Sequence, residues 1–406
     1  MNISVSIKVK LKPDTLYAAD NFRLTTERYR QACNYVSNYV FNHDMLLKQA
    51  ELNKTLYHDI RDLFGLKAQM AQSVIRTVVA RYKTVRTQLH QQPFKYQDIN
   101  TGKWYCEPRN LSWLRKPIRF SRPQADLQRN RDWSYSAKHN RLSINTLHGR
   151  IKVTPICHGF NQYFDGTWQF GVAKLLHNRG KWYLHIAATK KITAFNPSQT
   201  QHVVGIDRGL WFLATTYDET GKTNFFNGRA IMRKRAKYQK VRAQLQSKGT
   251  KSAKRRLKQL SGRENRWMTD VNHQLSKTLV QHYDANTLFV LEDLTGVTFD
   301  TNDLPKSLRN QHRSWAFYQL EQMLTYKAHL NGSEVITVSA QYTSQRCPQC
   351  GIIRKDNRNH EHHEYCCVNC GYRSNDDRIG AMNIQELGQR YLTGIKNPKY
   401  ELITNA

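Results

Sequence analysis

Two pairs of cysteines near the C-terminus have the spacing of a metal site. The stretch "CPQCG" contains Cys347 and Cys350, and "CVNCG" contains Cys367 and Cys370. Four thiolates from two C-x-x-C pairs can surround one zinc ion in a closed tetrahedron, with no open position for water. The residues between the pairs are too polar to build a hydrophobic core, so the metal would hold this segment folded. We therefore predict a structural Zn²⁺ site rather than a catalytic one.

Other side chains in this segment are alternative zinc ligands. His360, His362 and His363 lie between the two pairs, and Cys366 adjoins the second pair. Because four thiolates already complete a tetrahedral site, we expect these side chains to be bystanders.

Three acidic residues stand at the ends of regular elements. Asp207 ends the apolar stretch "HVVGID" and Glu292 ends "NTLFVLE", whereas Asp377 follows a helix cap at Ser374 or Asn375. Each has an ordinary explanation, such as turn capping or the preference of acids for a helix N-terminus. Together, at strand ends that face the start of the last helix, they would share one cleft and repel each other.

Divalent cations would relieve that repulsion. Ligands that are all oxygen favour Mg²⁺ or Mn²⁺ over zinc. Two such ions, roughly 4 Å apart, can activate water and stabilise the leaving oxygen during cleavage of a phosphodiester. We predict that Asp207, Glu292 and Asp377 bind catalytic Mg²⁺.

The elements that must position these acids alternate between strands and helices. We expect strands at 203–207, 212–217, 223–226 and 288–291, and the last of these is a continuous apolar run typical of a buried parallel strand. A long basic helical region, 229–283, interrupts this series. A helix in "WAFYQLEQMLTYKAHLNG" and a strand in "SEVITVSA" follow, which indicates an α/β layer fold.

The N-terminal half has a different pattern. Residues 3–11 alternate between apolar and polar types, which predicts a half-buried strand. Apolar residues then recur at helical spacing from about Leu24 to Leu89, and short strands and turns follow from Phe94 to Thr189. The segment 190–202 contains Asn-Pro-Ser and is predicted to be a linker.

The net charge of +32 indicates a polyanionic partner, and nucleic acid is the first candidate. No run approaches the roughly 18 apolar residues of a membrane-spanning helix, and the N-terminus lacks the apolar core of a signal peptide. We therefore expect no membrane partner and a cytoplasmic location, close to the nucleoid when the protein is bound to DNA. The candidate nucleic-acid contacts, for which an ordinary solvated surface is the alternative, are Arg115, Lys116, Arg119, Arg122, Arg233, Lys234, Arg235, Lys254, Arg255 and Arg256.

Four motifs carry a resemblance to a known family. "GIDRGL", "LEDL", "TSQRCPQCG…CVNCG" and "NDDRIGAMNI" resemble the split RuvC nuclease and zinc ribbon of transposon-encoded TnpB proteins and of their relatives, the type V CRISPR effectors. Over 202–390 the motifs occur in the family's order. Over 1–200 the resemblance rests only on the order of the elements, a first strand followed by a helical insertion and a β-domain. The resemblance implies that Asp207, Glu292 and Asp377 are the RuvC acids, with Asp377 preferred to Asp376 because of its distance to Asn383–Ile384.

The same resemblance implies a multi-domain α+β and α/β architecture. A wedge-like β-barrel (1–22 and 94–190) would contain an inserted helical recognition domain (23–93), and a linker (191–201) would follow. An RNase H-like RuvC nuclease (202–341 and 374–392) would contain the zinc ribbon (342–373) and precede a C-terminal tail (393–406). Two departures from the family pattern are Arg208, where an apolar residue is common, and Ile379-Gly380, where the third motif usually has Asn-Ala.

The function implied is RNA-guided cleavage of double-stranded DNA beside a short motif, by a monomer that holds one guide RNA from its own locus. Two alternatives stay open. One is a nuclease-inactive RNA-guided repressor, and the other is a DNA-only transposase or resolvase-type nuclease that needs no RNA.

Overall fold

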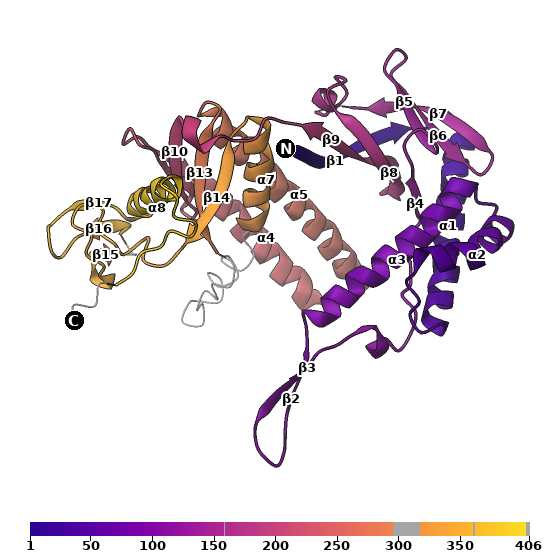
Figure 1. The fold of residues 1–406 in the computed structure, drawn as a ribbon, viewed down its shortest axis with the longest axis horizontal. Coiled ribbons are helices and arrows are strands. Elements are labelled where there is room, and N and C mark those ends of the chain that lie inside the picture. The colour runs from indigo at the N-terminus through magenta and orange to yellow at the C-terminus, as the bar shows by residue number, and fades with distance from the viewer. Residues whose placement is uncertain (158, 295–316, 360–361, 403–406) are drawn as a thin grey trace. The chain divides into compact units, whose positions relative to one another are not determined.

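The computed structural model describes residues 1–157, 159–294, 317–359 and 362–402 (Figure 1). The chain divides into two compact units, one of residues 2–191 and the other of residue 1 with residues 192–406. We call them the N-terminal and the C-terminal unit. Among the described residues, no helix is both long enough and apolar enough to cross a bilayer.

The N-terminal unit is built on a seven-stranded antiparallel sheet that curls into a nearly closed barrel. Its strand order is β4-β8-β9-β1-β7-β6-β5. The strand β1 (Asn2–Lys12) lies in the middle and pairs with β9 and β7. Its side chains Ile3, Ile7 and Val9 are buried, which confirms the predicted alternation. The other strands are β4 (Gln124–Leu127), β5 (Trp133–Ser136), β6 (Arg141–Thr146), β7 (Gly149–Ile156), β8 (Gln169–Asn178) and β9 (Lys181–Lys191).

Three helices are inserted between β1 and the rest of the sheet. They are α1 (Leu16–Asn42), α2 (Gln49–Phe64) and α3 (Ala68–His90). Helix α1 begins earlier than the apolar periodicity suggested, because the Thr15 side chain caps it by accepting a hydrogen bond from the Ala18 amide. After α3, the strands β2 (Phe94–Gln97) and β3 (Trp104–Glu107) form a separate hairpin (Figure 1).

The C-terminal unit has a five-stranded sheet of order β12-β11-β10-β13-β14. Strands β10 (His202–Asp207), β13 (Thr287–Asp293) and β14 (Glu334–Ser339) run parallel, and β11 (Phe212–Tyr217) and β12 (Thr223–Asn227) are antiparallel additions. The register pairs Ile206 with Leu291. The next residues along these two strands, Asp207 and Glu292, are therefore neighbours at the carboxyl edge of the sheet.

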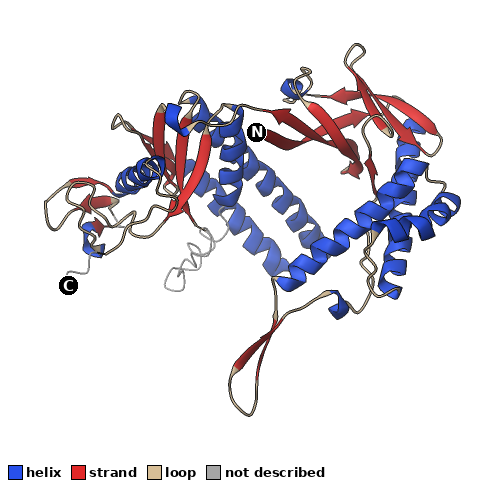
Figure 2. Ribbon diagram, viewed as in Figure 1, coloured by secondary structure: helices blue, strands red, loops and turns tan. Residues whose placement is uncertain are grey.

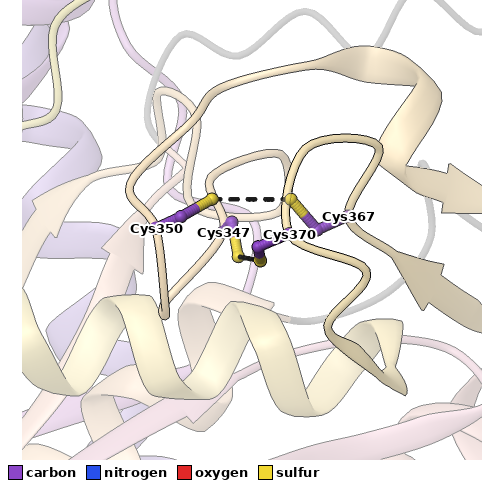
Figure 3. A group of neighbouring side chains, drawn as sticks. All are labelled: Cys347, Cys350, Cys367 and Cys370. Carbon is purple, nitrogen blue, oxygen red and sulfur yellow. Dashed lines mark hydrogen bonds between the residues drawn. The ribbon is translucent and has the colours of Figure 1, made fainter.

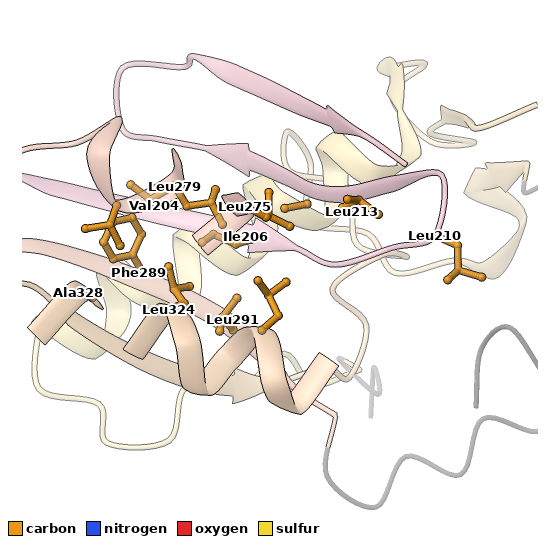
Figure 4. Close-up of a cluster of buried hydrophobic side chains, with 13 residues drawn as sticks. Val204, Ile206, Leu210, Leu213, Leu275, Leu279, Phe289, Leu291, Leu324 and Ala328 are labelled. Carbon is orange, nitrogen blue, oxygen red and sulfur yellow. The ribbon is translucent and has the colours of Figure 1, made fainter. Parts of the chain in front are cut away.

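Helices cover both faces of this sheet (Figure 2). On one face, Val204, Ile206 and Phe289 pack with Leu275 of α5 (Lys251–Gln281) and Leu324 of α7 (Phe317–Leu330), as Figure 4 shows. On the other face, the strand side chains Val203, Leu288 and Val290 pack against Ile384 and Leu387 of α8 (Asp376–Leu392). This alternation explains why the strands are apolar throughout. The remaining long helix, α4 (Arg229–Lys248), packs against α5.

Helix α8 comes unusually close to the sheet. A Cβ atom at Gly205 would lie 2.1 Å from the Ala381 carbonyl oxygen, and one at Gly388 would lie 2.4 Å from Val290 Cγ2. Both positions must therefore be glycine for the helix to lie where it does. This close packing places the first turn of α8 beside the end of β10.

Residues 342–373, the cysteine lobe, precede α8. They contain β15 (Arg358–Asn359) and β16 (Glu364–Cys366). In a small antiparallel sheet, β16 lies in the middle and pairs with β15 on one side and with β17 (Arg373–Asn375) on the other. Strand β17 runs directly into α8, where Asn375 caps the helix by accepting from the Asp377 and Arg378 amides. The lobe is thus joined without a linker to the turn that carries Asp377.

Candidate active site and metal centre

The three predicted acids meet at the edge of the C-terminal sheet. Burial is the main cause that raises the pKa of Asp207 well above its usual range, and the charges of Glu292 and Asp377 raise it further. Since charges act strongly only at short range in a protein interior, these three carboxyl groups form one electrostatic cluster. The cluster joins two strand ends to a helix start, as the sequence predicted.

The environments of Glu292 and Asp377 differ. Thr343 donates a hydrogen bond of 2.5 Å to Glu292 Oε1, which fixes that carboxyl group. Burial raises the pKa of Glu292, whereas the hydrogen bond from Thr343 and the charge of Arg208 lower it. Burial and the neighbouring Asp376 raise the pKa of Asp377 to about 6. A carboxyl group whose pKa is raised in this way by burial and a neighbouring acid is typical of a functional site.

A cation from the cysteine lobe lies among these acids. Arg358 Nε is 2.9 Å from Asp376 Oδ2, and Arg358 Nη2 is 3.8 Å from Asp377 Oδ1. Its charge lowers the pKa of Asp207, Glu292 and Asp377. No motif of the sequence pointed to Arg358. The adjacent acids Asp376 and Asp377 were the available signal that a nearby cation was required.

Asp376 and Asp377 have different surroundings. The Asp376 carboxylate is fully buried and lies against Arg358 and His363 Nδ1, the latter at 3.4 Å. The Asp377 side chain keeps 10% of its surface exposed and has one long contact to Arg358. His363, Asp376 and Asp377 also lie close enough together to hold a metal ion. Asp377 is the less engaged of the two acids, and its choice as the third RuvC acid stays a prediction.

Arg208 is a second cation beside the acids, and it is buried. Its side chain is 2% exposed, and its Nη1 lies 3.1 Å from Glu321 Oε2 of α7. Its Nη2 donates a hydrogen bond of 2.5 Å to the Glu292 main-chain carbonyl. The residue that departs from the family pattern therefore ties the end of β13 to α7. Its position after Asp207, at the carboxyl end of β10, was the only signal in the sequence.

The four predicted cysteines come together in the cysteine lobe (Figure 3). The Sγ atoms of Cys347 and Cys370 are 3.6 Å apart, and those of Cys350 and Cys367 are also 3.6 Å apart. Zinc–sulfur bonds of about 2.3 Å in a tetrahedron imply sulfur separations of about 3.8 Å. The residues therefore fit a zinc ion.

Two equivalent turns build this centre. The Gly351 amide donates to the Cys347 carbonyl and the Gly371 amide to the Cys367 carbonyl, each at 2.9 Å. Both glycines have positive φ, 78° and 71°, a region that favours glycine. The Ile352 amide is the main cause that lowers the pKa of the Cys350 thiol to about 6, which favours the thiolate required for metal binding.

Residues around the cysteines take the places expected of bystanders, where they are described. Cys366 is exposed. His363 contacts Asp376 instead of a thiol, and His360 lies outside the described residues. Ile379, the departure from the third motif, packs with Cys347, Tyr365 and Cys367. The cysteine cluster is thus packed against the turn that carries Asp377.

Of the ten predicted nucleic-acid contacts, all but Arg235 are exposed. Arg235 is a correction, because it is only 2% exposed on a helix that packs against α5. Burial lowers its pKa and the charge of Glu264 opposes that effect. The basic pattern of α4 did not reveal which of its cations faces a neighbouring helix. Lys234, the preceding residue, lies over the Trp267 ring, 4.4 Å from its centroid.

Comparisons with known proteins identify two family models in this chain. Residues 187–296 match the model described as "Probable transposase" (OrfB_IS605), and residues 317–384 match "Cas12f1-like, TNB domain". The second range contains the four cysteines and Asp377. Together the two models span the strands and the helix start that carry the acidic cluster.

Curated relatives agree with the family models. The chain is 29% identical over 232 residues to the CRISPR-associated endodeoxyribonuclease Cas12f1 of Syntrophomonas palmitatica, a match that covers 52% of this chain and 44% of that protein. It is 26% identical over 249 residues to TnpB-like protein MJ0751 of Methanocaldococcus jannaschii, covering 59% of this chain and 87% of that one. The chain thus spans about half the length of the Cas12f1 proteins that it matches.

One solved structure shares the overall fold. The mini-RNA-guided endonuclease CRISPR-Cas_phi3 superposes with a TM-score of 0.51 at 10% identity, covering 95% of this chain and 92% of that one. At this identity the likeness shows the fold alone. The resemblance to the TnpB family and to compact type V effectors, predicted from the motifs, is confirmed by the family models and the curated relatives.

Proposed function

We propose that this chain, a relative of the TnpB-like proteins and of Cas12f1, is an RNA-guided endonuclease that cleaves double-stranded DNA by metal-dependent hydrolysis. The observation that carries the proposal is the electrostatic cluster of Asp207, Glu292 and Asp377 at the edge of the sheet. Uncompensated buried carboxylates are costly, and divalent cations are their usual partners. The order β12-β11-β10-β13-β14 supports an RNase H-like, RuvC-type nuclease domain.

In this proposal the three acids hold Mg²⁺ or Mn²⁺. Bound there, the metal would activate water and stabilise the leaving oxygen of the phosphodiester. Thr343 orients the Glu292 carboxyl group, and Arg208 holds the Glu292 main chain. Arg358 neutralises Asp376, so that the charge of Asp377 stays available for the metal.

The cysteine lobe supports the acidic cluster in this proposal. Cys347, Cys350, Cys367 and Cys370 hold a structural Zn²⁺, and the lobe supplies Arg358 and His363 to the Asp376 carboxylate. Zinc would therefore act on cleavage through position alone. Because all four positions of the tetrahedron are taken by thiolates, no site for a reacting water is left.

The proposed partners are a guide RNA from the same locus and a DNA target beside a short motif, inside a prokaryotic cell, with one RNA on each monomer. The exposed cations Arg115, Lys116, Arg119 and Arg122 of the N-terminal unit and Arg233, Lys234, Lys254, Arg255 and Arg256 of the C-terminal unit would contact phosphates.

The test is cleavage by the purified protein with the RNA that co-purifies from cells carrying its native flanking DNA. Plasmid that matches the RNA should be cut in Mg²⁺, and Asp207→Ala, Glu292→Ala and Asp377→Ala should abolish cutting while RNA binding is kept. Asp293→Ala is the matched control, because this acid directly follows Glu292 and its side chain is exposed. Cutting that survives in any of the three variants would count against the assignment.

The alternatives give different results in the same experiment. A nuclease-inactive RNA-guided repressor would bind the matched plasmid and leave it uncut in Mg²⁺. A DNA-only nuclease would still cut specific DNA after the RNA is digested away. All three acids are present and lie in one cluster, which favours a nuclease over the inactive repressor.

A further inference from the structure

The hairpin β2–β3 displays aromatic rings that no core covers. All eight residues of its two strands are exposed. Tyr96 stands opposite Tyr105 in the register, and Gln97 stands opposite Trp104. Since side chains alternate along a strand, Phe94, Tyr96 and Tyr105 share one face and Trp104 lies on the other.

The rings on the first face form a continuous row. The Phe94 and Tyr96 centroids are 5.8 Å apart and those of Tyr96 and Tyr105 are 5.7 Å apart, both in stacked geometry. Trp113, just beyond the hairpin, extends the row with its centroid 5.5 Å from that of Phe94. We call these four rings the aromatic row.

Hairpin stability alone explains part of this arrangement. Cross-strand aromatic pairs stabilise a two-stranded hairpin, which is marginal in water without them. That role does not account for Trp104, which is 69% exposed on the opposite face and takes no part in the row. Phe94, Tyr96 and Tyr105 also keep 43–45% of their surface exposed. An apolar surface of this kind, outside any core, marks a binding site.

The segment that follows the hairpin supplies positive charge on a fixed backbone. The Ser37 hydroxyl donates to the Ile118 carbonyl at 2.6 Å, and the Asn34 side chain bonds both the amide and the carbonyl of Phe120. Four exposed cations stand along this anchored segment, namely Arg115, Lys116, Arg119 and Arg122. The hairpin itself carries both signs of charge, with Lys95 and Lys103 against Asp98 and Glu107.

We propose that Trp104 and the aromatic row form a stacking platform for unpaired bases of RNA, while the cations at 115–122 hold the adjoining phosphates. Rings that accept base faces beside cations that follow a backbone are the means by which proteins bind single strands. The choice of RNA rests on the proposed function, in which the guide RNA is the constant partner and target DNA is a passing one. A constant partner is the one that would keep so many apolar rings covered.

The experiment measures binding of the full-length protein to a short oligouridylate and to a strand of the same length whose residues are abasic, at one fixed salt concentration. We expect the base-bearing strand to bind roughly tenfold more tightly, as one or two stacked bases would provide. Trp104→Ala should remove most of that difference and leave abasic binding unchanged. Because Trp104 lies off the aromatic row, this variant keeps the hairpin intact.

Three controls separate stacking from charge and from folding. Trp104→Phe keeps a ring and should restore most of the preference for bases. Ile99→Ser, at a tip residue that is 99% exposed, should change nothing. Arg115→Ala with Lys116→Ala should weaken both strands alike and reduce the dependence of binding on salt.

Equal binding of the base-bearing and abasic strands by the native protein would overturn the proposal. Tighter binding of the corresponding oligodeoxynucleotide than of the RNA would overturn the choice of RNA. Neither measurement requires cleavage, so a protein that fails to cut DNA and still shows the ring-dependent preference would refute the proposed function and leave the platform standing.

Discussion

Gly380 lies against the carboxyl group of Asp207, so close that a Cβ atom at this position would stand 3.0 Å from Asp207 Oδ2 and 3.1 Å from Cγ. The motif that this segment resembles has Ala in the corresponding place. The absence of a side chain in this protein therefore leaves Asp207 slightly more room than the family pattern implies. The first turn of α8 sets the position of Asp207 as well as that of Asp377.

Gly380→Ala is expected to slow cleavage without unfolding the protein. Alanine in a helix interior is more favourable than glycine by about 1 kcal/mol. However, the new methyl group would force the buried Asp207 carboxyl group to shift by a few tenths of an ångström. Cleavage rates in Mg²⁺ and thermal unfolding midpoints would be measured together. Gly388→Ala is the comparison, because its Cβ would meet Val290 at 2.4 Å and should lower the unfolding midpoint. An unchanged cleavage rate in Gly380→Ala would show that Asp207 has space to move.

The acidic cluster should make the zinc-loaded protein without Mg²⁺ less stable as pH rises. Burial raises the folded-state pKa of Asp377 from about 3.8 to about 6, so the folded state holds this proton more tightly than the unfolded chain does. Below about pH 3.8 Asp377 is protonated in both states and does not change the free energy of unfolding. The free energy of unfolding falls as the pH rises from 3.8 to 6, and it stays low above pH 6.

Asp377→Asn removes that dependence. At pH 7 without Mg²⁺, its free energy of unfolding should exceed that of the native protein by about 1–3 kcal/mol, and its unfolding midpoint should be higher. Added Mg²⁺ should stabilise the native protein and leave the variant unchanged. A variant that gains nothing at pH 7 relative to pH 4 would mean that Arg358 and His363 already compensate the charge.

Loss of the zinc ion should disorganise the active site. Without the metal the polar cysteine lobe has little to hold it, and Ile379 loses its contacts with Tyr365 and Cys367. Cys350→Ser should therefore lower zinc content, measured by atomic emission, and abolish cleavage. Cys366→Ser, at the exposed cysteine beside the site, should keep both. Full activity in a zinc-free Cys350→Ser protein would contradict the structural role of the lobe.

Arg208 should matter for stability and for metal binding separately. Arg208→Leu leaves Glu321 and the Glu292 carbonyl without their partner, and breaking a buried ion pair typically costs about 3–5 kcal/mol. A second change, Glu321→Leu, should restore much of the unfolding midpoint. Because neither variant holds the end of β13, both should need more Mg²⁺ for half-maximal cleavage. A normal Mg²⁺ requirement in the double variant would limit Arg208 to a role in folding.

Much of the architecture could be predicted because its signals are local. The unbroken apolar runs that end in Asp207 and Glu292 predicted buried strands with acids at their ends, and the structure has β10 and β13 there. The region 229–283 was predicted to be helical, and α4 and α5 lie within it, with Leu275 and Leu279 of α5 in the hydrophobic core. The C-x-x-C pairs predicted a cluster of thiols, since two short turns suffice to present them.

The sequence by itself thus determined the elements, the acids at their ends and the four cysteines, because hydrophobic periodicity and ligand spacing act over a few residues. Only the tertiary structure decided where three cations lie: Arg208 and Arg235 are buried, and Arg358, whose side chain is 21% exposed, pairs with Asp376. Each is one arginine among many in a chain of net charge +32, and the residues near it in the sequence give at most an indirect signal of where it lies. Whether such a side chain faces water or a carboxylate depends on which distant elements pack against it, and that is settled by the fold.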